Sequence, residues 1–282
     1  MTAIQACTTS MLKRLCPNNL VVPKQCSDAA RRTLTRVGKS VERQQQQQQQ
    51  QLQLQQQLQH VRSFSSSPMI CDKHKIVDLR SDTVTLPTQA MIQRASSAPL
   101  GDDVMGEDPT ILELEGMMAD KFGKERGLYV PTGTMANLVA LLSHCDKSRA
   151  SEIIIGAGSH INLWEGGNAS SVGGIHTRQV AEDAETAELS EDDVLDCLRN
   201  GVDDHWPVTK LLCLENSHNM CGGVALPKEY FDRMGKLAHS EKMNHIDVHV
   251  DGARIFNTAV ALDTDVRDLC EHVDSVSICL SK

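Results

Sequence analysis

Hydrophobic residues fall in short runs, separated by longer amphipathic stretches, from about Ile76 to the end of the chain. Each run has the length of a strand, and its β-branched residues favour a strand buried on both faces. The predicted buried strands are Glu152–Ile155, Lys210–Leu214, Ile246–Val250 and Ser275–Leu280, with a shorter strand at Gly127–Pro131. Strands that alternate with helices need crossover connections, so the pattern predicts an α/β fold with a mostly parallel sheet and flanking helices.

Capping residues and helical spacing mark the segments between these strands. Asp108 and Pro109 are a typical N-cap and first-turn pair, and Gly123 is a typical helix end. The apolar positions between them recur at helical spacing and are Ile111, Leu114, Met118 and Phe122. Further helices are predicted at Met135–Cys145, Ser190–Leu198, Pro227–Ala238 and Arg254–Leu262.

The first 70 residues differ in composition from the rest. They hold nine Lys and Arg against two acidic residues, and they contain a glutamine run at 44–51 that continues through scattered leucines to Gln59. A basic, acid-poor leader is typical of a mitochondrial transit peptide, and Arg62–Ser67 resembles a matrix-processing site. We expect 1–70 to be a transit peptide with a Gln-rich disordered segment, and the protein to be mitochondrial. The alternative is a disordered tail on a cytoplasmic protein.

The rest of the chain is acidic, with 19 basic and 35 acidic residues left from totals of 28 and 37. Nucleic-acid phosphates are bound by clustered Lys and Arg, so we expect no nucleic-acid partner. No apolar run approaches the roughly 20 residues of a membrane span, so we expect no membrane association. The ten cysteines are scattered without a CxxC pair, which favours free thiols in a reducing compartment.

Asp251 and Lys282 each follow one of the predicted strands. An acid and an amine at neighbouring strand ends fit pyridoxal 5'-phosphate, because the acid binds the ring nitrogen and the amine binds the cofactor covalently. Burial at a strand end also favours the neutral, nucleophilic form of a lysine. A plainer role for Asp251 remains open, since it can cap a helix or pair with Arg254.

The turn Thr132-Gly133-Thr134 lies between a predicted strand and an apolar helix. Its hydroxyls and the free N–H groups of the first helical turn fit a phosphate cradle, and a simple N-cap is the alternative. His245 and His249 lie in a strand pattern rather than on one helix face, so no metal site is expected. The chain has no G-x-S-x-G elbow, no P-loop and no complete dinucleotide fingerprint.

Seven motifs occur in order between Lys75 and Lys282. They are Asp78–Thr85, Gly101–Pro109, Thr132–Thr134, Ser159–Ile161, Glu215–Asn219, Asp251–Arg254 and Cys279–Lys282. Together they resemble the low-specificity L-threonine aldolases, which are pyridoxal-phosphate enzymes of fold type I. The resemblance implies that 75–282 is an incomplete cofactor-binding large domain, and that the family's small C-terminal domain is absent from this sequence.

The resemblance also implies roles in cofactor binding. Lys282 is the catalytic lysine that holds the cofactor, and Asp251 keeps the ring nitrogen protonated. His160 stacks on the ring as a further catalytic residue, with an ordinary turn histidine as the alternative. Gly133 and Thr134 hold the phosphate, beside the hydroxyl of Thr132.

Substrate contacts are implied in the same way. Ser81 and Arg254 bind the amino-acid carboxylate, where the guanidinium offers a bidentate fork. His205 matches a catalytic histidine near the substrate hydroxyl, although an exposed loop histidine is the plainer reading. Trp164 departs from the family, which often has Tyr at this position, and an indole lacks a hydroxyl for proton transfer.

The implied reaction is cleavage of L-threonine or L-allo-threonine to glycine and acetaldehyde by a homodimer or homotetramer. We expect this chain alone to be inactive, because part of the family's site is missing. Two alternatives stay open. One is a non-catalytic subunit or isoform, and the other is a different lyase or an aminotransferase of fold type I.

Overall fold

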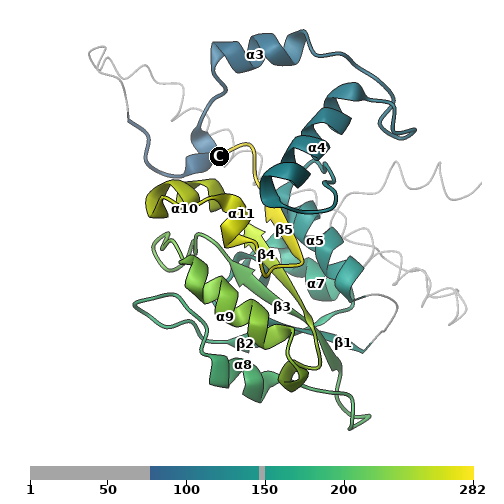
Figure 1. Ribbon diagram of the computed structural model, residues 1–282, viewed down its shortest axis with the longest axis vertical. Coiled ribbons are helices and arrows are strands. Elements are labelled where there is room, and N and C mark those ends of the chain that lie inside the picture. The colour runs from purple at the N-terminus through teal and green to yellow at the C-terminus, as the bar shows by residue number, and fades with distance from the viewer. Residues whose placement is uncertain (1–76, 146–149) are drawn as a thin grey trace, which may run out of the picture. The chain divides into compact units, whose positions relative to one another are not determined.

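The computed structural model describes residues 77–145 and 150–282, and the expected leader and Gln-rich segment lie outside these ranges. A five-stranded parallel sheet, in the order β2-β1-β3-β4-β5, forms the centre (Figure 1). Its strands are β1 (Ser151–Gly156), β2 (His176–Val180), β3 (Val208–Glu215), β4 (Asp247–Gly252) and β5 (Ser275–Ile278). The predicted α/β fold with a parallel sheet is confirmed.

Helices cover both faces of the sheet (Figure 1). One face packs on α5 (Gly133–His144) and α7 (Asn168–Ser171), and the other on α8 (Glu191–Cys197) and α9 (Lys228–Ala238). The remaining helices are η1 (Asp82–Val84), α3 (Gln89–Ser96), α4 (Pro109–Phe122), α6 (His160–Leu163), η2 (Glu165–Gly167), η3 (Glu241–Met243), α10 (Ile255–Leu262) and α11 (Val266–Leu269). In the described ranges, no helix combines the length and apolarity of a membrane span.

Side-chain alternation along β4 divides its residues between the two faces. Val248 and Val250 are buried in the larger core, which also contains Phe231 and Met234 of α9. Each such side chain contributes about 1.5–3 kcal/mol through burial. Asp247, His249 and Asp251 occupy the alternate positions, and these form hydrogen bonds with residues of α5. The α5 face of the sheet therefore carries a row of polar groups beside its apolar core.

The capping pattern around α4 matches the prediction. The Asp108 carboxylate accepts hydrogen bonds from the backbone N–H groups of Thr110 and Ile111, at 2.9 and 3.1 Å. It also accepts one from Gly101, at 3.0 Å, which ties the preceding loop to the helix start. Gly123 ends the helix in the left-handed region, with φ 64°, where a residue without Cβ is unstrained.

One strand prediction was wrong, and one strand was missed. Gly127–Pro131 is not a strand, because a cleft of about 490 Å³ separates it from β5 and leaves it without a backbone partner. The edge strand β2 was not predicted, since its sequence His-Thr-Arg-Gln-Val is mostly polar and only Val180 is buried. Strand boundaries also moved by one or two residues: β4 continues through Asp251 to Gly252, and β5 ends at Ile278.

Candidate active site

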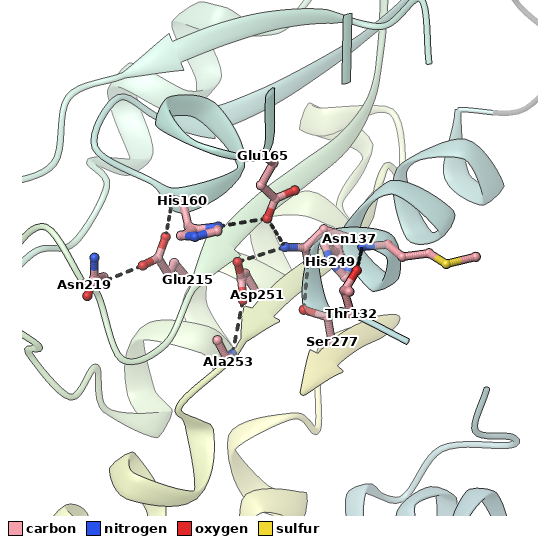
Figure 2. A network of polar contacts seen from close by, with 11 residues as sticks. Thr132, Asn137, His160, Glu165, Glu215, Asn219, His249, Asp251, Ala253 and Ser277 are labelled. Atoms are coloured by element: carbon pink, nitrogen blue, oxygen red, sulfur yellow. Dashed lines mark hydrogen bonds and ion pairs between the residues drawn. The ribbon is translucent and has the colours of Figure 1, made fainter. Parts of the chain in front are cut away.

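Asp251 lies near the carboxyl end of β4, and its side chain is only 4% exposed. In the sheet it is flanked by Glu215 of β3 and Ser277 of β5. One carboxylate oxygen accepts a hydrogen bond from the Asn137 side-chain amide, at 2.9 Å, and the other accepts the backbone N–H of Ala253, at 3.1 Å (Figure 2). These two donors fix the carboxylate at the edge where ligands of parallel sheets bind.

Asn137 of α5 is the centre of the polar network in Figure 2. Its amide nitrogen donates to Asp251 and to Glu165 Oε1, at 2.9 and 2.8 Å. Its oxygen accepts from Ser277 Oγ, at 2.7 Å, and faces His249 Nε2, at 3.1 Å. A side-chain amide offers two N–H groups and two lone pairs, so all four positions are used and the amide has one orientation.

Glu165 begins η2 and turns a fully buried carboxyl group toward Asn137. Its Oε1 also contacts His160 Nδ1, at 2.8 Å, while Oε2 is buried without a hydrogen-bond partner. Burial raises the pKa of this carboxyl group. Its backbone is left-handed, with φ 62°, which costs a non-glycine residue about 1–2 kcal/mol. Such strain at a buried acid indicates a functional position.

Glu215 ends β3 and joins two loops at the same edge of the sheet. Its carboxylate accepts the backbone N–H of His160, at 2.6 Å, and that of Asn219, at 2.9 Å (Figure 2). Burial, followed by the nearby charge of Asp251, raises the pKa of this carboxyl group. Glu215 therefore holds the start of α6, and with it the His160 ring, beside Asp251.

Three buried acids thus meet at this edge without a strong cation. Among the described residues, neither Lys nor Arg forms an ion pair with Asp251, Glu165 or Glu215. His160 contacts Glu165, and the charges of His218 and Arg254 act on Glu215 more weakly and at longer range. Uncompensated buried charge is unfavourable. The cluster therefore fits a positively charged ligand group, and a protonated pyridine nitrogen is such a group.

The N-terminus of α5 lies at the same edge of the sheet. A Cβ atom on Gly133 would stand 2.9 Å from Cys279 Sγ, so glycine permits the close approach of the helix to the segment after β5. Thr132 is the N-cap, and its hydroxyl accepts the Met135 N–H at 3.1 Å while keeping its own proton for donation. Thr134 follows in the first helical turn. The predicted phosphate cradle fits these residues, because first-turn N–H groups have no intrahelical acceptor.

Arg254 pairs with Asp82, the residue that follows Ser81, so its guanidinium already has a carboxylate partner. Arg254 Nη2 lies 2.9 Å from Asp82 Oδ1, and its Nε donates to the other oxygen of the same group. The Arg254 hydrogen bond is the main cause that lowers the pKa of Asp82. Ser81 caps η1 by accepting the Thr83 N–H at 3.2 Å. The Arg254 guanidinium thus binds the carboxylate of Asp82 and does not contact Asp251.

Two predicted site residues are not joined to this cluster by any described contact. Lys282 is exposed and lies four residues beyond β5, where its charge adds a minor lowering of the pKa of Asp82. His205 is 91% exposed, contacts Asp203 at 2.7 Å, and lies in the loop before β3 at the amino end of the sheet. Within one chain, the plainer reading of His205 as an exposed loop histidine agrees with its position. Trp164 is half exposed at the start of η2.

Comparison with known proteins agrees with this arrangement. The chain is an α/β protein with a parallel sheet, and its acid cluster lies at the carboxyl edge of the sheet, where the ligands of α/β enzymes bind. Residues 78–282 match the family model described as Beta-eliminating lyase, and the chain therefore belongs to that family.

Several similar proteins are threonine aldolases by name. "Probable low-specificity L-threonine aldolase 2" of Arabidopsis thaliana is 49% identical over 210 residues, which are 74% of this chain and 58% of that protein. "Low specificity L-threonine aldolase" of Escherichia coli is 43% identical over 208 residues, or 73% of this chain and 59% of that protein. The chain therefore spans somewhat more than half the length of these relatives.

A solved structure supports the fold independently. The threonine aldolase of Leishmania major superposes with a TM-score of 0.52 at 18% identity, over 66% of this chain and 52% of that one. At this level of identity the likeness extends to the fold alone.

Proposed function

We propose that this chain forms the cofactor-binding part of a pyridoxal-phosphate-dependent threonine aldolase. The observation that carries the proposal is Asp251, a buried acid at the carboxyl end of β4 that has hydrogen-bond donors but no cation. The family match and the names of the similar proteins support the same reaction.

In this proposal, the residues at the sheet edge each bind a different part of the cofactor. Asp251 holds a proton on the ring nitrogen, and the His160 ring covers one face. The start of α5 at Gly133 and Thr134 binds the phosphate, and Lys282 provides the amine. The cofactor supplies an electron-accepting ring that takes up negative charge when a bond at the substrate Cα breaks.

Substrate orientation is assigned to Arg254 in this proposal. The substrate carboxylate would replace Asp82 on the guanidinium, since both ligands are carboxylates and the fork is bidentate. Holding the carboxylate fixes which Cα bond stands perpendicular to the ring, and that bond is the one that breaks. Ser81 would add one hydroxyl donor beside it.

A titration with pyridoxal phosphate tests cofactor binding. We expect a saturable visible absorbance band that is lost in Lys282→Ala and kept in Lys242→Ala, a matched change at an exposed lysine. The absence of a saturable band in the unaltered chain, or its persistence in Lys282→Ala, would contradict the assigned role of Lys282.

Product analysis tests the reaction. The whole protein should convert L-threonine or L-allo-threonine to equal amounts of glycine and acetaldehyde, whereas this chain alone is expected to be inactive. A β-elimination would instead release ammonia and a 2-oxo acid, and an aminotransferase would require an amino acceptor. Either of these product patterns would replace the aldolase proposal with the corresponding reaction class.

We also propose import into mitochondria and assembly as a homodimer or homotetramer. The basic composition of 1–70 supports import, and the resemblance to the threonine aldolases supports assembly. A reporter fused to 1–69 should reach mitochondria, and a diffuse cytosolic signal would contradict this. Light scattering of the purified protein should give a mass of two or four subunits, and a monomer would contradict assembly.

A further inference from the structure

A chain of hydrogen bonds runs between α5 and the sheet, from a half-exposed acid at the amino end of the sheet to the candidate site. We call it the polar seam, and its residues are Asp247, His144, Ser275, His249 and Asn137. Two come from α5, two from β4 and one from β5. The contact distances in this order are 2.8, 2.7, 2.8 and 3.1 Å, and Asn137 then reaches Asp251.

The direction of hydrogen-bond donation along the seam is set at Asp251. Asn137 turns its amide nitrogen toward Asp251, because a carboxylate accepts hydrogen bonds and does not donate, and the second N–H of the same amide then points at Glu165 Oε1. The amide oxygen then faces His249 Nε2, which has to carry a proton. Burial lowers the pKa of His249 to about 4, so the ring is neutral and its Nδ1 bears a lone pair.

The remaining contacts follow from that lone pair. The Ser275 hydroxyl donates its proton to His249 Nδ1, so its oxygen accepts from His144 Nε2. The other nitrogen of His144 faces the Asp247 carboxylate and also has to donate. With both nitrogens donating, His144 is an imidazolium. It ends α5, and the C-terminus of a helix favours a cation.

We propose that His144 and Asp247 are positioning residues, and that their ion pair orients Ser275, His249 and Asn137 so that the Asn137 N–H groups point at Asp251 and Glu165. Asp247 is half exposed, whereas His249 and Asn137 are buried. The pair thus links a half-exposed acid to the interior hydrogen bonds. The effect of the His144–Asp247 pair on cofactor binding rests on the function proposed above. The order of hydrogen-bond donation along the seam does not depend on that function.

Loss of the His144 proton would break the order of donation. If a neutral His144 still donates to Asp247 from Nδ1, its Nε2 has a lone pair and accepts the proton of the Ser275 hydroxyl. That hydroxyl can then no longer donate to His249 Nδ1. The groups that face His144 are Asp247 of β4 and Ser275 of β5, with His249 one step further. Those that face His249 are Ser275 and Asn137, with Asp251 beyond them. The donor and acceptor roles of the seam residues therefore depend on one another.

Imidazole nitrogen NMR of the purified cofactor-free protein tests the arrangement. We expect His144 to be protonated at both nitrogens on the acid side of its titration, with His249 neutral and protonated at Nε2. As the pH rises, the His249 ring and Asn137 side-chain signals should shift together with the His144 titration. His249 protonated at Nδ1, a His144 that is never an imidazolium, or a His144 titration without these shifts would overturn the proposal.

Two variants separate the seam from general stability. In His144→Gln the coupled shifts of His249 and Asn137 should vanish, while His176→Gln, which alters the exposed partner of Glu152, should keep them. With pyridoxal phosphate added, the pH profile of the absorbance band should change in His144→Gln alone. Shifts that survive in His144→Gln would overturn the seam. Failure of the unaltered protein to bind the cofactor would count against the proposed function and leave the NMR result intact.

Discussion

The buried acids at the two ends of the sheet differ in their ion-pair partners. At the amino end, the side chain of Glu152 is fully buried and meets the Arg199 guanidinium at 3.1 Å, the His176 ring at 2.7 Å and the Thr209 hydroxyl at 3.3 Å. At the carboxyl end, Asp251 and its two neighbouring acids have hydrogen-bond donors but neither Lys nor Arg. The same kind of side chain meets a guanidinium at one end, whereas at the other it has neither Lys nor Arg as an ion-pair partner.

This difference teaches what each end contributes. A buried acid with a cation partner is part of the folded structure, and removal of either partner is costly. A buried acid without one lowers the stability of the empty protein and raises its affinity for a cationic ligand. We infer that the amino end stabilises the fold, whereas the carboxyl end is kept for the ligand.

The largest expected effect is at the amino end. Arg199→Ala leaves Glu152 buried without its guanidinium and should lower the free energy of unfolding by about 3–5 kcal/mol. Urea denaturation measures this change. Arg94→Ala is the control, because Arg94 lies 3.9 Å from Glu113 at an exposed site, and no measurable change is expected there. Equal effects from the two variants would contradict the structural role of Arg199.

Asn137→Ala should have the next largest effect. It removes the donor that Asp251 and Glu165 share, and an unsatisfied buried group costs about 1–3 kcal/mol. The cost should be larger at neutral pH than in mild acid, where a protonated carboxyl group needs fewer donors. Ser277→Ala, which removes a donor to the amide oxygen alone, is the matched comparison and should cost less.

Asp251→Asn should change stability little and in the opposite direction. The substitution removes a buried charge that has no cation, so the cofactor-free protein should be as stable as before or up to about 1 kcal/mol more stable. Thermal and urea denaturation provide the measurement. A loss comparable to that of Arg199→Ala would show that the two ends do not differ as described.

The smallest effect is a slope with pH. The pKa of Glu165 is raised by burial above its ordinary value of 4.5, so the folded state binds a proton that the unfolded state has released. The stability from this group is complete below that value and is lost as pH rises through the raised pKa. Glu165→Gln should therefore gain on the parent protein as pH increases above 4.5, and exposed Glu113→Gln should not. A constant difference between Glu165→Gln and the parent protein would contradict the raised pKa.

Local signals in the sequence were enough for much of the fold. Asp108, Pro109 and Gly123 mark the ends of α4, because capping depends on neighbouring residues alone. Gly127–Pro131 has a strand-like sequence, but a strand also needs a partner, and that partner is not encoded locally. The polar strand β2 was missed because its place at the edge of the sheet is set by packing.

The site was predicted only where a residue type has a known role. Asp251, His160 and the turn at Gly133 were predicted in this way, and all three lie at one edge of the sheet. Asn137 and Glu165 were missed, because the contacts that define them join residues far apart in sequence. Two signals in the sequence could have indicated them: Asn137 is a polar residue inside an apolar helix, and Glu165 is an acid followed by two glycines.

The most direct test of the account is the affinity for pyridoxal phosphate of two variants that each replace one buried acid by its amide. We expect the unaltered protein and Glu152→Gln to bind the cofactor with similar affinity, and Asp251→Asn to bind it at least about 100-fold more weakly, since loss of a buried charge partner costs 3 kcal/mol or more. Fluorescence or absorbance titration gives the three dissociation constants. Equal affinity of Asp251→Asn and the unaltered protein would contradict the claim that the carboxyl end holds its charge for the ligand.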